Sequence, residues 1–168
     1  MSFGRFLKEL VSPSCGSPTS ATAYLAQHEL FEQCPVLRAD IPVPSSWQEV
    51  LGPPSRCNAW IGTKSTLTPC HWDSYDNFLS QVQGFKRLVL LAPDQHSRLH
   101  VETSSGTCAQ GNISPINVED PDLTKYPDFA HAEVYLVDLI PGDVIFMPSG
   151  WWHQLRALSS SISVNFWY

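Results

Sequence analysis

From residue 56 onward, short runs of Val, Ile, Leu and aromatic residues alternate with turns rich in Gly, Pro, Asp and Ser. This rhythm is the feature that most constrains the fold, because runs of this length and composition are typical of β-strands. Eight of them at this spacing favour a mainly β fold, a double-stranded β-helix (jelly roll) with a few flanking N-terminal helices. The predicted strands are Asn58–Gly62, Thr66–His71, Asn77–Gln83, Phe85–Ala92, Ala132–Leu139, Asp143–Met147, Trp152–Leu158 and Ser160–Trp167.

Two connections between these segments carry predictions of their own. Gly84 separates two predicted strands and indicates a tight hairpin between them. A long polar insert occupies residues 93–129, and its segment Asp120–Thr124 is predicted to begin a brief helix. Inserts of this length in a β domain are usually functional or mobile.

The segments before residue 56 predict short helices and loops. Ser2–Leu10 has apolar residues at helical spacing, and residues 12–20 are rich in Ser, Pro, Gly and Thr, which is typical of a linker. Ala21–Gln33 is predicted to be a second helix, capped by Thr22. Residues 35–56 contain five prolines, too many for long regular structure, and are expected to wrap the surface.

Length and charge limit the possible classes of protein. With 168 residues, the chain predicts one domain over residues 21–168, preceded by a helix and linker over residues 1–20. The formal net charge of −6 argues against a surface that coats nucleic acid. No apolar run reaches about 18 residues and no secretory signal is visible, so neither a nucleic-acid nor a membrane partner is expected.

The cysteines indicate the compartment. Their number is odd and they contain no Cys-x-x-Cys pair, which favours reduced thiols in an intracellular protein of the nucleus or cytoplasm. The five cysteines are Cys15, Cys34, Cys57, Cys70 and Cys108.

Two distant segments contain the candidate metal ligands. His71 and Asp73 lie two residues apart, so on an extended strand both side chains project to the same side and can reach one ion. His153 follows a run in which a turn at Gly142, a short strand and a second turn present the histidine. Two imidazoles and one carboxylate form the facial triad that holds Fe(II) with coordination positions open. A His-x-Asp pair alone is common by chance, and a histidine merely satisfied at a strand start is the alternative for His153.

Taken together, the motifs resemble the Jumonji-C 2-oxoglutarate oxygenases of the cupin superfamily, over about residues 24–168. Within that family the chain is most similar to small protein hydroxylases, an arginyl hydroxylase and an asparaginyl hydroxylase. The motifs are Tyr24–His28, Thr68–Asp73, Asn77-Phe78, Gly84–Arg87, Asp120–Asp122 before Tyr126–Phe129, Pro141–Asp143, Trp151–His153 and Val164–Tyr168.

The resemblance implies Fe(II) as cofactor and 2-oxoglutarate and O2 as co-substrates. It places Lys86 at the distal carboxylate of 2-oxoglutarate, with the hydroxyls of Tyr24 and Thr68 beside it, and it implies co-substrate contacts for Asn77 and Asn165. The residue pattern supports Lys86 independently, because a lysine that alternates with leucines on one strand face would bury its ammonium and require an anion. A snorkelling surface lysine is the alternative, and the adjacent Arg87 is expected to face solvent.

Several neighbouring residues are expected to serve packing rather than chemistry. Trp72 lies between two ligands and must point away from the metal. Phe166 and Trp167 are interpreted as core residues, and Asn165 between apolar neighbours should have a specific partner. Cys70 is expected to be a core thiol, although beside iron it could become a stray ligand or an oxidation site.

The resulting hypothesis is an oxygenase that hydroxylates a side chain of a protein substrate and decarboxylates 2-oxoglutarate to succinate. Demethylation of N-methyl-lysine by the same chemistry is the second hypothesis. An inactive cupin-like binding module and a zinc hydrolase remain as alternatives. The domain is short at its N-terminus for a Jumonji-C catalytic region, which bears on stability and turnover more than on metal binding.

Overall fold

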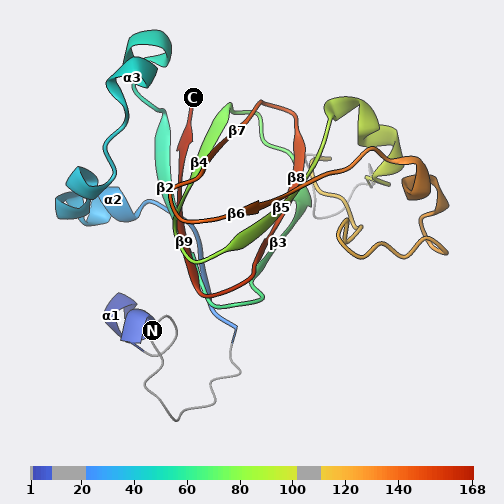
Figure 1. The fold of residues 1–168 in the computed structure, drawn as a ribbon, viewed down its shortest axis with the longest axis horizontal. Helices are drawn as coiled ribbons and strands as arrows, with labels where there is room; N and C mark the ends of the chain where they lie inside the picture. Colours follow the sequence, from blue (N-terminus) through green and yellow to red (C-terminus); the bar gives the residue numbers. More distant parts are fainter. Residues whose placement is uncertain (1, 9–21, 102–110) are drawn as a thin grey trace.

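The computed structural model describes residues 2–8, 22–101 and 111–168, and their strands form two antiparallel sheets (Figure 1). The five-stranded sheet has the order β1-β2-β9-β4-β7, and the four-stranded sheet has the order β3-β8-β5-β6. Their bounds are β1 Tyr24–His28, β2 Arg56–Gly62, β3 Leu67–His71, β4 Asn77–Gln83, β5 Lys86–Leu91, β6 Tyr135–Leu139, β7 Val144–Met147, β8 Trp152–Ala157 and β9 Ser161–Trp167. The mainly β jelly roll predicted from the sequence is therefore confirmed.

Short helices lie outside the two sheets. In Figure 1, α2 and α3 lie beyond β2, whereas the insert after β5 lies on the side of β8. The helices are α1 Phe3–Phe6, α2 Leu30–Gln33, α3 Ser45–Leu51 and the 3-10 helices η2 Pro35–Asp40, η3 Pro93–Arg98 and η4 Pro127–His131. Among the described residues, no helix has both the length and the apolar character that crossing a membrane requires.

All eight predicted strands are present as β2 to β9, but the helix predicted for Ala21–Gln33 is wrong for Tyr24–His28. That segment opens with β1, and only Leu30–Gln33 is helical. β1 pairs with β2 in an antiparallel ladder that places Tyr24 opposite Gly62. A register shift between Leu25 and His28 interrupts this ladder, where Gln27 has a φ of 47°, and pairing resumes with His28 opposite Ala59. Strand pairing with a distant segment outweighs a weak local helical preference here.

The prediction of a tight hairpin at Gly84 is also wrong. The turn exists and Gly84 adopts a φ of 72°, but β4 and β5 on either side of it belong to different sheets. A Cβ atom at this position would lie 2.1 Å from the carbonyl oxygen of Ser160. Only glycine combines this backbone conformation with such a close approach, so Gly84 is where the chain crosses from one sheet to the other.

The remaining local predictions divide between confirmed, wrong and undescribed. The N-terminal helix is shorter than Ser2–Leu10 within the described residues, and the linker at residues 12–20 lies outside them. The proline-rich stretch forms only the short helices η2 and α3, as its composition indicated. The helix predicted to begin at residues 120–124 is a hydrogen-bonded turn instead, because the Asp122 carboxylate accepts from Thr124 and Lys125.

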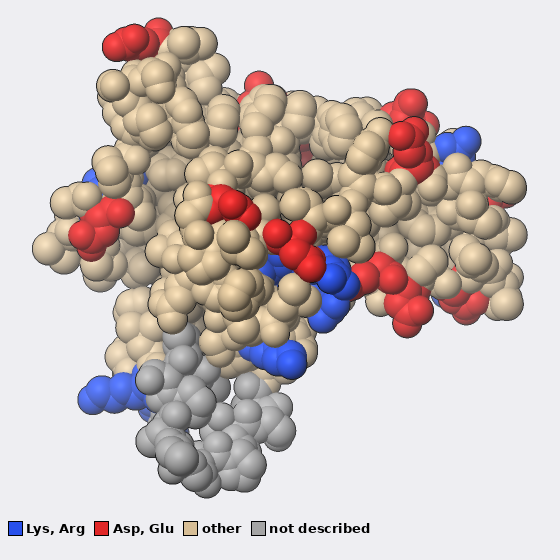
Figure 2. Space-filling view, in the orientation of Figure 1, with Lys and Arg blue, Asp and Glu red and all other residues tan. Residues whose placement is uncertain are grey.

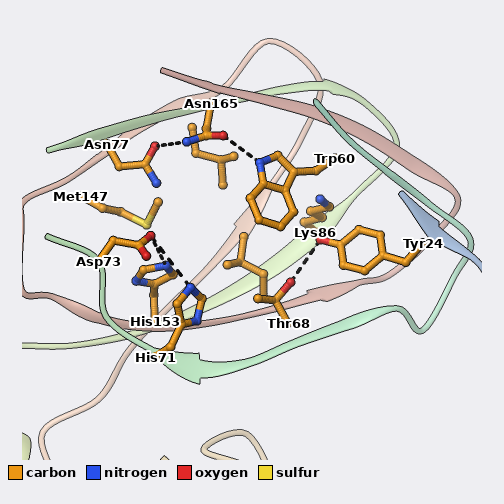
Figure 3. A pocket seen from close by; sticks show the side chains of 12 residues that line it. Tyr24, Trp60, Thr68, His71, Asp73, Asn77, Lys86, Met147, His153 and Asn165 are labelled. Carbon is orange, nitrogen blue, oxygen red and sulfur yellow. Dashed lines mark hydrogen bonds and ion pairs between the residues drawn. The ribbon is translucent and has the colours of Figure 1, made fainter. Parts of the chain in front are cut away.

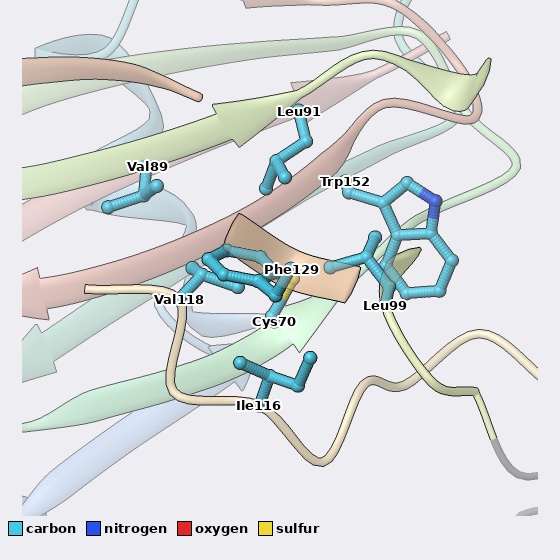
Figure 4. Packing of buried hydrophobic residues seen from close by; sticks show 8 residues of the cluster. All are labelled: Cys70, Val89, Leu91, Leu99, Ile116, Val118, Phe129 and Trp152. Carbon is cyan, nitrogen blue, oxygen red and sulfur yellow. The ribbon is translucent and has the colours of Figure 1, made fainter. Parts of the chain in front are cut away.

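Alternation along the strands divides the interior into separate clusters. On β5, Leu88 and Leu90 point between the sheets, where they pack with Leu79 and Met147 of the opposite sheet. Val89 and Leu91 point outward and pack with the insert (Figure 4). That outer cluster consists of Cys70, Val89, Leu91, Leu99, Ile116, Val118, Phe129 and Trp152. A third cluster covers the outside of the five-stranded sheet and contains Phe6, Leu30, Phe31, Ala59, Ile61, Val164 and Phe166.

With the exception of the buried Lys86, the charged side chains of the described residues are at least partly exposed. Figure 2 shows acidic and basic groups scattered over one face, with wide uncharged regions between them. Arg87 faces outward as predicted and donates from Nε and Nη2 to the two carboxylate oxygens of Asp138, both at 2.7 Å. Glu119 joins Arg87 to Arg156, so the outer face of the four-stranded sheet carries a small ion-pair network.

Replacing Leu88 with alanine tests the packing between the sheets. Leu88 has no exposed surface, so the Leu88→Ala variant should lower the free energy of unfolding by about 2–5 kcal/mol. Leu136 on β6 is 57% exposed and provides the matched control, for which Leu136→Ala should cost about 0.5 kcal/mol or less. Urea denaturation followed by fluorescence measures both. Equal losses in the two variants would contradict the assignment of Leu88 to the central cluster.

Candidate metal centre and adjoining cavity

Strand pairing brings the two candidate histidines together. β3 and β8 are neighbouring antiparallel strands, and His71 lies directly opposite His153 in their register. Their ring centroids are 4.2 Å apart. Asp73 follows β3 by two residues, and its Oδ2 lies 3.9 Å from His71 Nε2 and 3.7 Å from His153 Nε2. One ligand atom from each of the three residues thus lies within 4.8 Å of the others, a spacing suited to a single ion.

Backbone carbonyls orient both imidazoles. His71 Nδ1 lies 2.8 Å from the Pro69 carbonyl oxygen, and His153 Nδ1 lies 3.0 Å from that of Trp151. Because a carbonyl oxygen only accepts, each Nδ1 carries a proton and donates it to its carbonyl oxygen, and each Nε2 is directed toward Asp73. Histidines that bind metals commonly have their other ring nitrogen held by a hydrogen bond of this kind.

The loop that carries Asp73 is held from both sides. Gly150 N donates to the Asp73 carbonyl oxygen at 2.9 Å, which ties this loop to the turn before His153. Trp72 N donates to the Asn112 carbonyl oxygen at 3.0 Å, and Asn112 Nδ2 donates back to the Trp72 carbonyl oxygen at 3.1 Å. The carboxylate is therefore positioned by backbone contacts before any ion binds.

Burial shifts the pKa of two of the three groups, His153 and Asp73. Burial, together with the nearby His71, lowers the pKa of His153 to about 3, so this imidazole is neutral at physiological pH. Burial raises the pKa of Asp73, while the His71 charge acts in the opposite direction. Neutral imidazole is the form that binds a metal, and a bound cation would favour the ionised carboxylate.

A cavity extends from these three residues between the two sheets (Figure 3). Both sheets contribute side chains to its wall. The lining residues are Tyr24, Trp60, Thr68, His71, Asp73, Asn77, Leu79, Lys86, Met147, His153, Leu155 and Asn165. All eight site residues predicted from the sequence therefore line one cavity, together with four that the sequence did not indicate.

The Lys86 side chain is buried in this cavity with only 2% of its surface exposed, which rules out a snorkelling surface lysine. Its Nζ lies 5.7 Å from the centre of the Tyr24 ring, and no carboxylate in the described part of the chain pairs with it. Burial lowers the pKa of Lys86 to about 8. The Tyr24 and Thr68 hydroxyls lie beside it, with 3.1 Å between their oxygens. A buried ammonium beside two hydroxyls is a ready site for an anion.

Asparagine side chains form the wall on the opposite sheet. Asn165 Nδ2 donates to Asn77 Oδ1 at 3.0 Å, and Asn165 Oδ1 accepts from Trp60 Nε1 at 2.8 Å. Asn165 thus has the specific partners that its position predicted. Trp60 was missed by the sequence analysis, although its alternation with Asn58 on β2 and the need of a buried indole N–H for a partner are signals that could have found it.

Comparison with known proteins gives consistent matches. The sequence model of the cupin-like domain family matches residues 1–168. The JmjC domain-containing protein F of Dictyostelium discoideum is 37% identical over 194 residues, which cover 97% of this chain and 40% of that protein. Lysine-specific demethylase 8 of Danio rerio is 40% identical over 157 residues, covering 91% and 37%, and lysine-specific demethylase JMJ30 of Arabidopsis thaliana is 34% identical over 168 residues, covering 100% and 38%. The chain is a cupin-like domain of the Jumonji-C type.

This Jumonji-C domain spans about 40% of the length of these curated relatives. Members of the family generally use Fe(II) and 2-oxoglutarate. The residues present fit both groups. Two imidazoles and a carboxylate are a suitable ligand set for Fe(II), and the buried Lys86 ammonium, which has no counter-ion among the described residues, suits a carboxylate at the far end of the cavity.

Residues next to the ligands in the Jumonji-C domain face the opposite side of the sheet. Cys70 is fully buried in the outer cluster, and burial raises the pKa of its thiol to about 12. Trp72 packs against the same cluster, as its place between two ligands predicted. Phe166 is a core residue, whereas Trp167 is buried, stacks on Tyr75 with ring centroids 4.8 Å apart and also reaches an outer groove.

The metal end of the cavity opens into this wider groove on the surface. The groove shares His71 and Asp73 with the cavity, so a molecule lying in it reaches the candidate metal site from outside. Its lining residues are Tyr24, Ala26, Gln27, Trp60, Leu67, Thr68, Pro69, His71, Asp73, Asn112, Ile113 and Trp167.

Removing the Asp73 carboxylate tests the metal centre. We expect Asp73→Ala to weaken Mn(II) binding by at least about 100-fold, because it deletes the anionic ligand of the set. Electron paramagnetic resonance of free Mn(II) measures the affinity. Asp128→Ala removes an exposed carboxylate and is the matched control, with unchanged affinity. Tight binding by the Asp73 variant would contradict a metal site at this position.

Proposed function

We propose that this Jumonji-C domain is an Fe(II)- and 2-oxoglutarate-dependent oxygenase that hydroxylates a side chain of a protein substrate. One observation carries the proposal. A triad of two imidazoles and one carboxylate shares a cavity with a buried ammonium that has no carboxylate partner among the described residues. A keto-acid that chelates the metal at one end of the cavity would reach the ammonium at the other end with its second carboxylate. A metal that only stabilises the fold would leave the ammonium without a role.

Different residues would bind the metal and the co-substrate at the two ends of the cavity. His71, Asp73 and His153 would hold Fe(II), which in complex with 2-oxoglutarate supplies oxidative decarboxylation to succinate and oxygen transfer to a C–H bond. Lys86 would pair with the distal carboxylate, and the hydroxyls of Tyr24 and Thr68 would complete its hydrogen bonding. Asn77 and Asn165 line the opposite wall, near the metal end.

The enclosing side chains would also limit the access of water. Leu79, Met147 and Leu155 line the cavity between the polar groups, and Leu79 and Met147 are almost fully buried. A dry cavity strengthens the pairing of an anion with Lys86 and protects the reacting centre from side reactions. The groove outside His71 and Asp73 is wider and more open than the cavity, which supports a protein or peptide substrate that approaches from the surface.

Demethylation is the second candidate function. Two of the three relatives compared above bear the name lysine-specific demethylase, and removal of an N-methyl group begins with the same hydroxylation of a carbon atom. The distinction depends on the substrate side chain that enters the groove. A zinc hydrolase accounts for the triad but gives no role to the buried Lys86 or to the paired amides of Asn77 and Asn165.

A direct experiment separates these possibilities. Anaerobic addition of Fe(II) and 2-oxoglutarate should produce a weak visible charge-transfer band, and admission of air should release succinate. Incubation with a peptide library should then yield products heavier by one oxygen, whereas demethylation would remove a methyl group from methylated peptides. Neither band nor succinate, with zinc retained, would favour a hydrolase or an inactive binding module.

The pKa of Lys86 predicts how co-substrate binding depends on pH. Since burial lowers this pKa to about 8, the free protein carries the ammonium below pH 8 and loses it above. Affinity for 2-oxoglutarate in the presence of Mn(II) should therefore be constant just below pH 8 and fall by up to about tenfold per pH unit above it. Calorimetric titration at several pH values measures this.

Lys86→Met provides the matched variant for this prediction. It keeps most of the aliphatic stem and removes the ammonium, so it should bind 2-oxoglutarate weakly and without the alkaline fall in affinity. Mn(II) binding should be unchanged, because Lys86 is not a member of the triad. A variant that retains the pH dependence of the original protein would show that another group causes it.

A further inference from the structure

Three polar side chains on neighbouring strands form one hydrogen-bonded row across the cavity wall (Figure 3). Trp60 on β2 contacts Asn165 on β9, and Asn165 contacts Asn77 on β4. The strand registers explain the row, because Asn165 lies opposite Asn58 of β2 and Leu79 of β4. Trp60 and Asn77 each lie two residues from one of these partners and therefore point to the same face of the sheet. Diagonal neighbours of this kind on one sheet face are within reach of long side chains. Asn165 and Asn77 are 1% and 6% exposed, so water has little access to either amide.

The indole N–H of Trp60 fixes the orientation of both amides, Asn165 and Asn77. An indole has one N–H and no acceptor, so the atom of Asn165 that lies 2.8 Å from Trp60 Nε1 must be its oxygen. The nitrogen of Asn165 then points the other way and donates to Asn77. The atom of Asn77 that receives this N–H must in turn be its oxygen, at 3.0 Å.

The amide nitrogen of Asn77, the last residue of the row, is available to donate to a molecule in the cavity. Asn77 Nδ2 makes no hydrogen bond to another described residue, and Figure 3 shows it on the cavity side of the amide, toward Asp73 and Met147. The wall beside the candidate metal site therefore presents N–H donors. With the row reversed, the Asn77 carbonyl oxygen would face the same space and would repel an anion.

We infer that Trp60 is a positioning residue whose single N–H sets both amides so that Asn77 offers donors to an anionic co-substrate beside the metal. This inference rests on the proposed function, since the anion is the 2-oxoglutarate of that proposal. Trp60 lines the same cavity, but the inferred effect is transmitted through Asn165 and Asn77.

The Trp60→Phe variant tests the inference, because it keeps an aromatic ring and removes the N–H. Affinity for 2-oxoglutarate, titrated by calorimetry in the presence of Mn(II), should fall by about tenfold or more, the usual effect of losing a hydrogen bond to a charged group. Mn(II) affinity without 2-oxoglutarate should not change. Trp47→Phe is the matched control, since Trp47 packs against Phe78 and Phe166 away from the cavity, and it should bind 2-oxoglutarate normally.

A double-mutant cycle separates positioning from a general structural effect. If Trp60 acts through Asn77, then adding Trp60→Phe to Asn77→Ala should change the 2-oxoglutarate affinity by less than about twofold. Independent, multiplicative losses would overturn the inference, and so would normal binding by Trp60→Phe alone. If Trp60→Phe does not fold, site-specific replacement of the indole N–H by sulfur, with benzothienylalanine, makes the same comparison with the ring size kept.

Binding of 2-oxoglutarate by the unsubstituted protein separates a failure of the inferred role of Trp60 from a failure of the proposed function. Binding of 2-oxoglutarate by the original protein but equally by the Trp60 variant would overturn the inferred role of Trp60 and leave the proposed function standing. Failure of the original protein to bind 2-oxoglutarate, with Mn(II) bound, would overturn the proposed function and the inference together.

Discussion

The antiparallel ladder between β3 and β8 is the interaction on which the site depends, because it sets His71 directly opposite His153. A slip of one residue would turn one imidazole to the other face of the sheet. The ladder is held from behind, where Cys70 and Trp152 are buried in the outer cluster. The Asp73 loop is tied to the turn that precedes His153 by a backbone hydrogen bond. Backbone pairing and outer packing, rather than the ligands themselves, thus determine the geometry of the candidate metal centre.

The same alternation builds the rest of the cavity. Lys86, Leu88 and Leu90 share the inner face of β5, and the residues between them face solvent or the insert. The five-stranded sheet contributes Asn77 and Asn165 from the opposite wall. Each sheet supplies part of the polar lining, so the site exists only where the two sheets face each other.

The period-two pattern made much of this predictable from the sequence. The segments that became β2 to β9 carry strong strand signals, and alternation from His71 to Asp73 and from Lys86 to Leu88 assigned those side chains to one face. β1 escaped because Tyr24–His28 has no strand signal of its own and is extended only through its ladder with β2. The sheet crossing at Gly84 depends on which strands pair, which local sequence does not specify. Trp60 was not predicted as a site residue for a related reason, since its inferred role depends on two amides on other strands.

The division between inner and outer faces has a consequence for the history of such domains. Most contacts that join the sheets to α1, α2 and the insert lie in the two outer clusters, and neither His71 nor Lys86 belongs to them. Substitution of His71 and Lys86 during evolution would leave intact the contacts that pack the outer segments against the sheets. Descendants without turnover could therefore persist as folded scaffolds, and shape alone would not tell them apart from working enzymes.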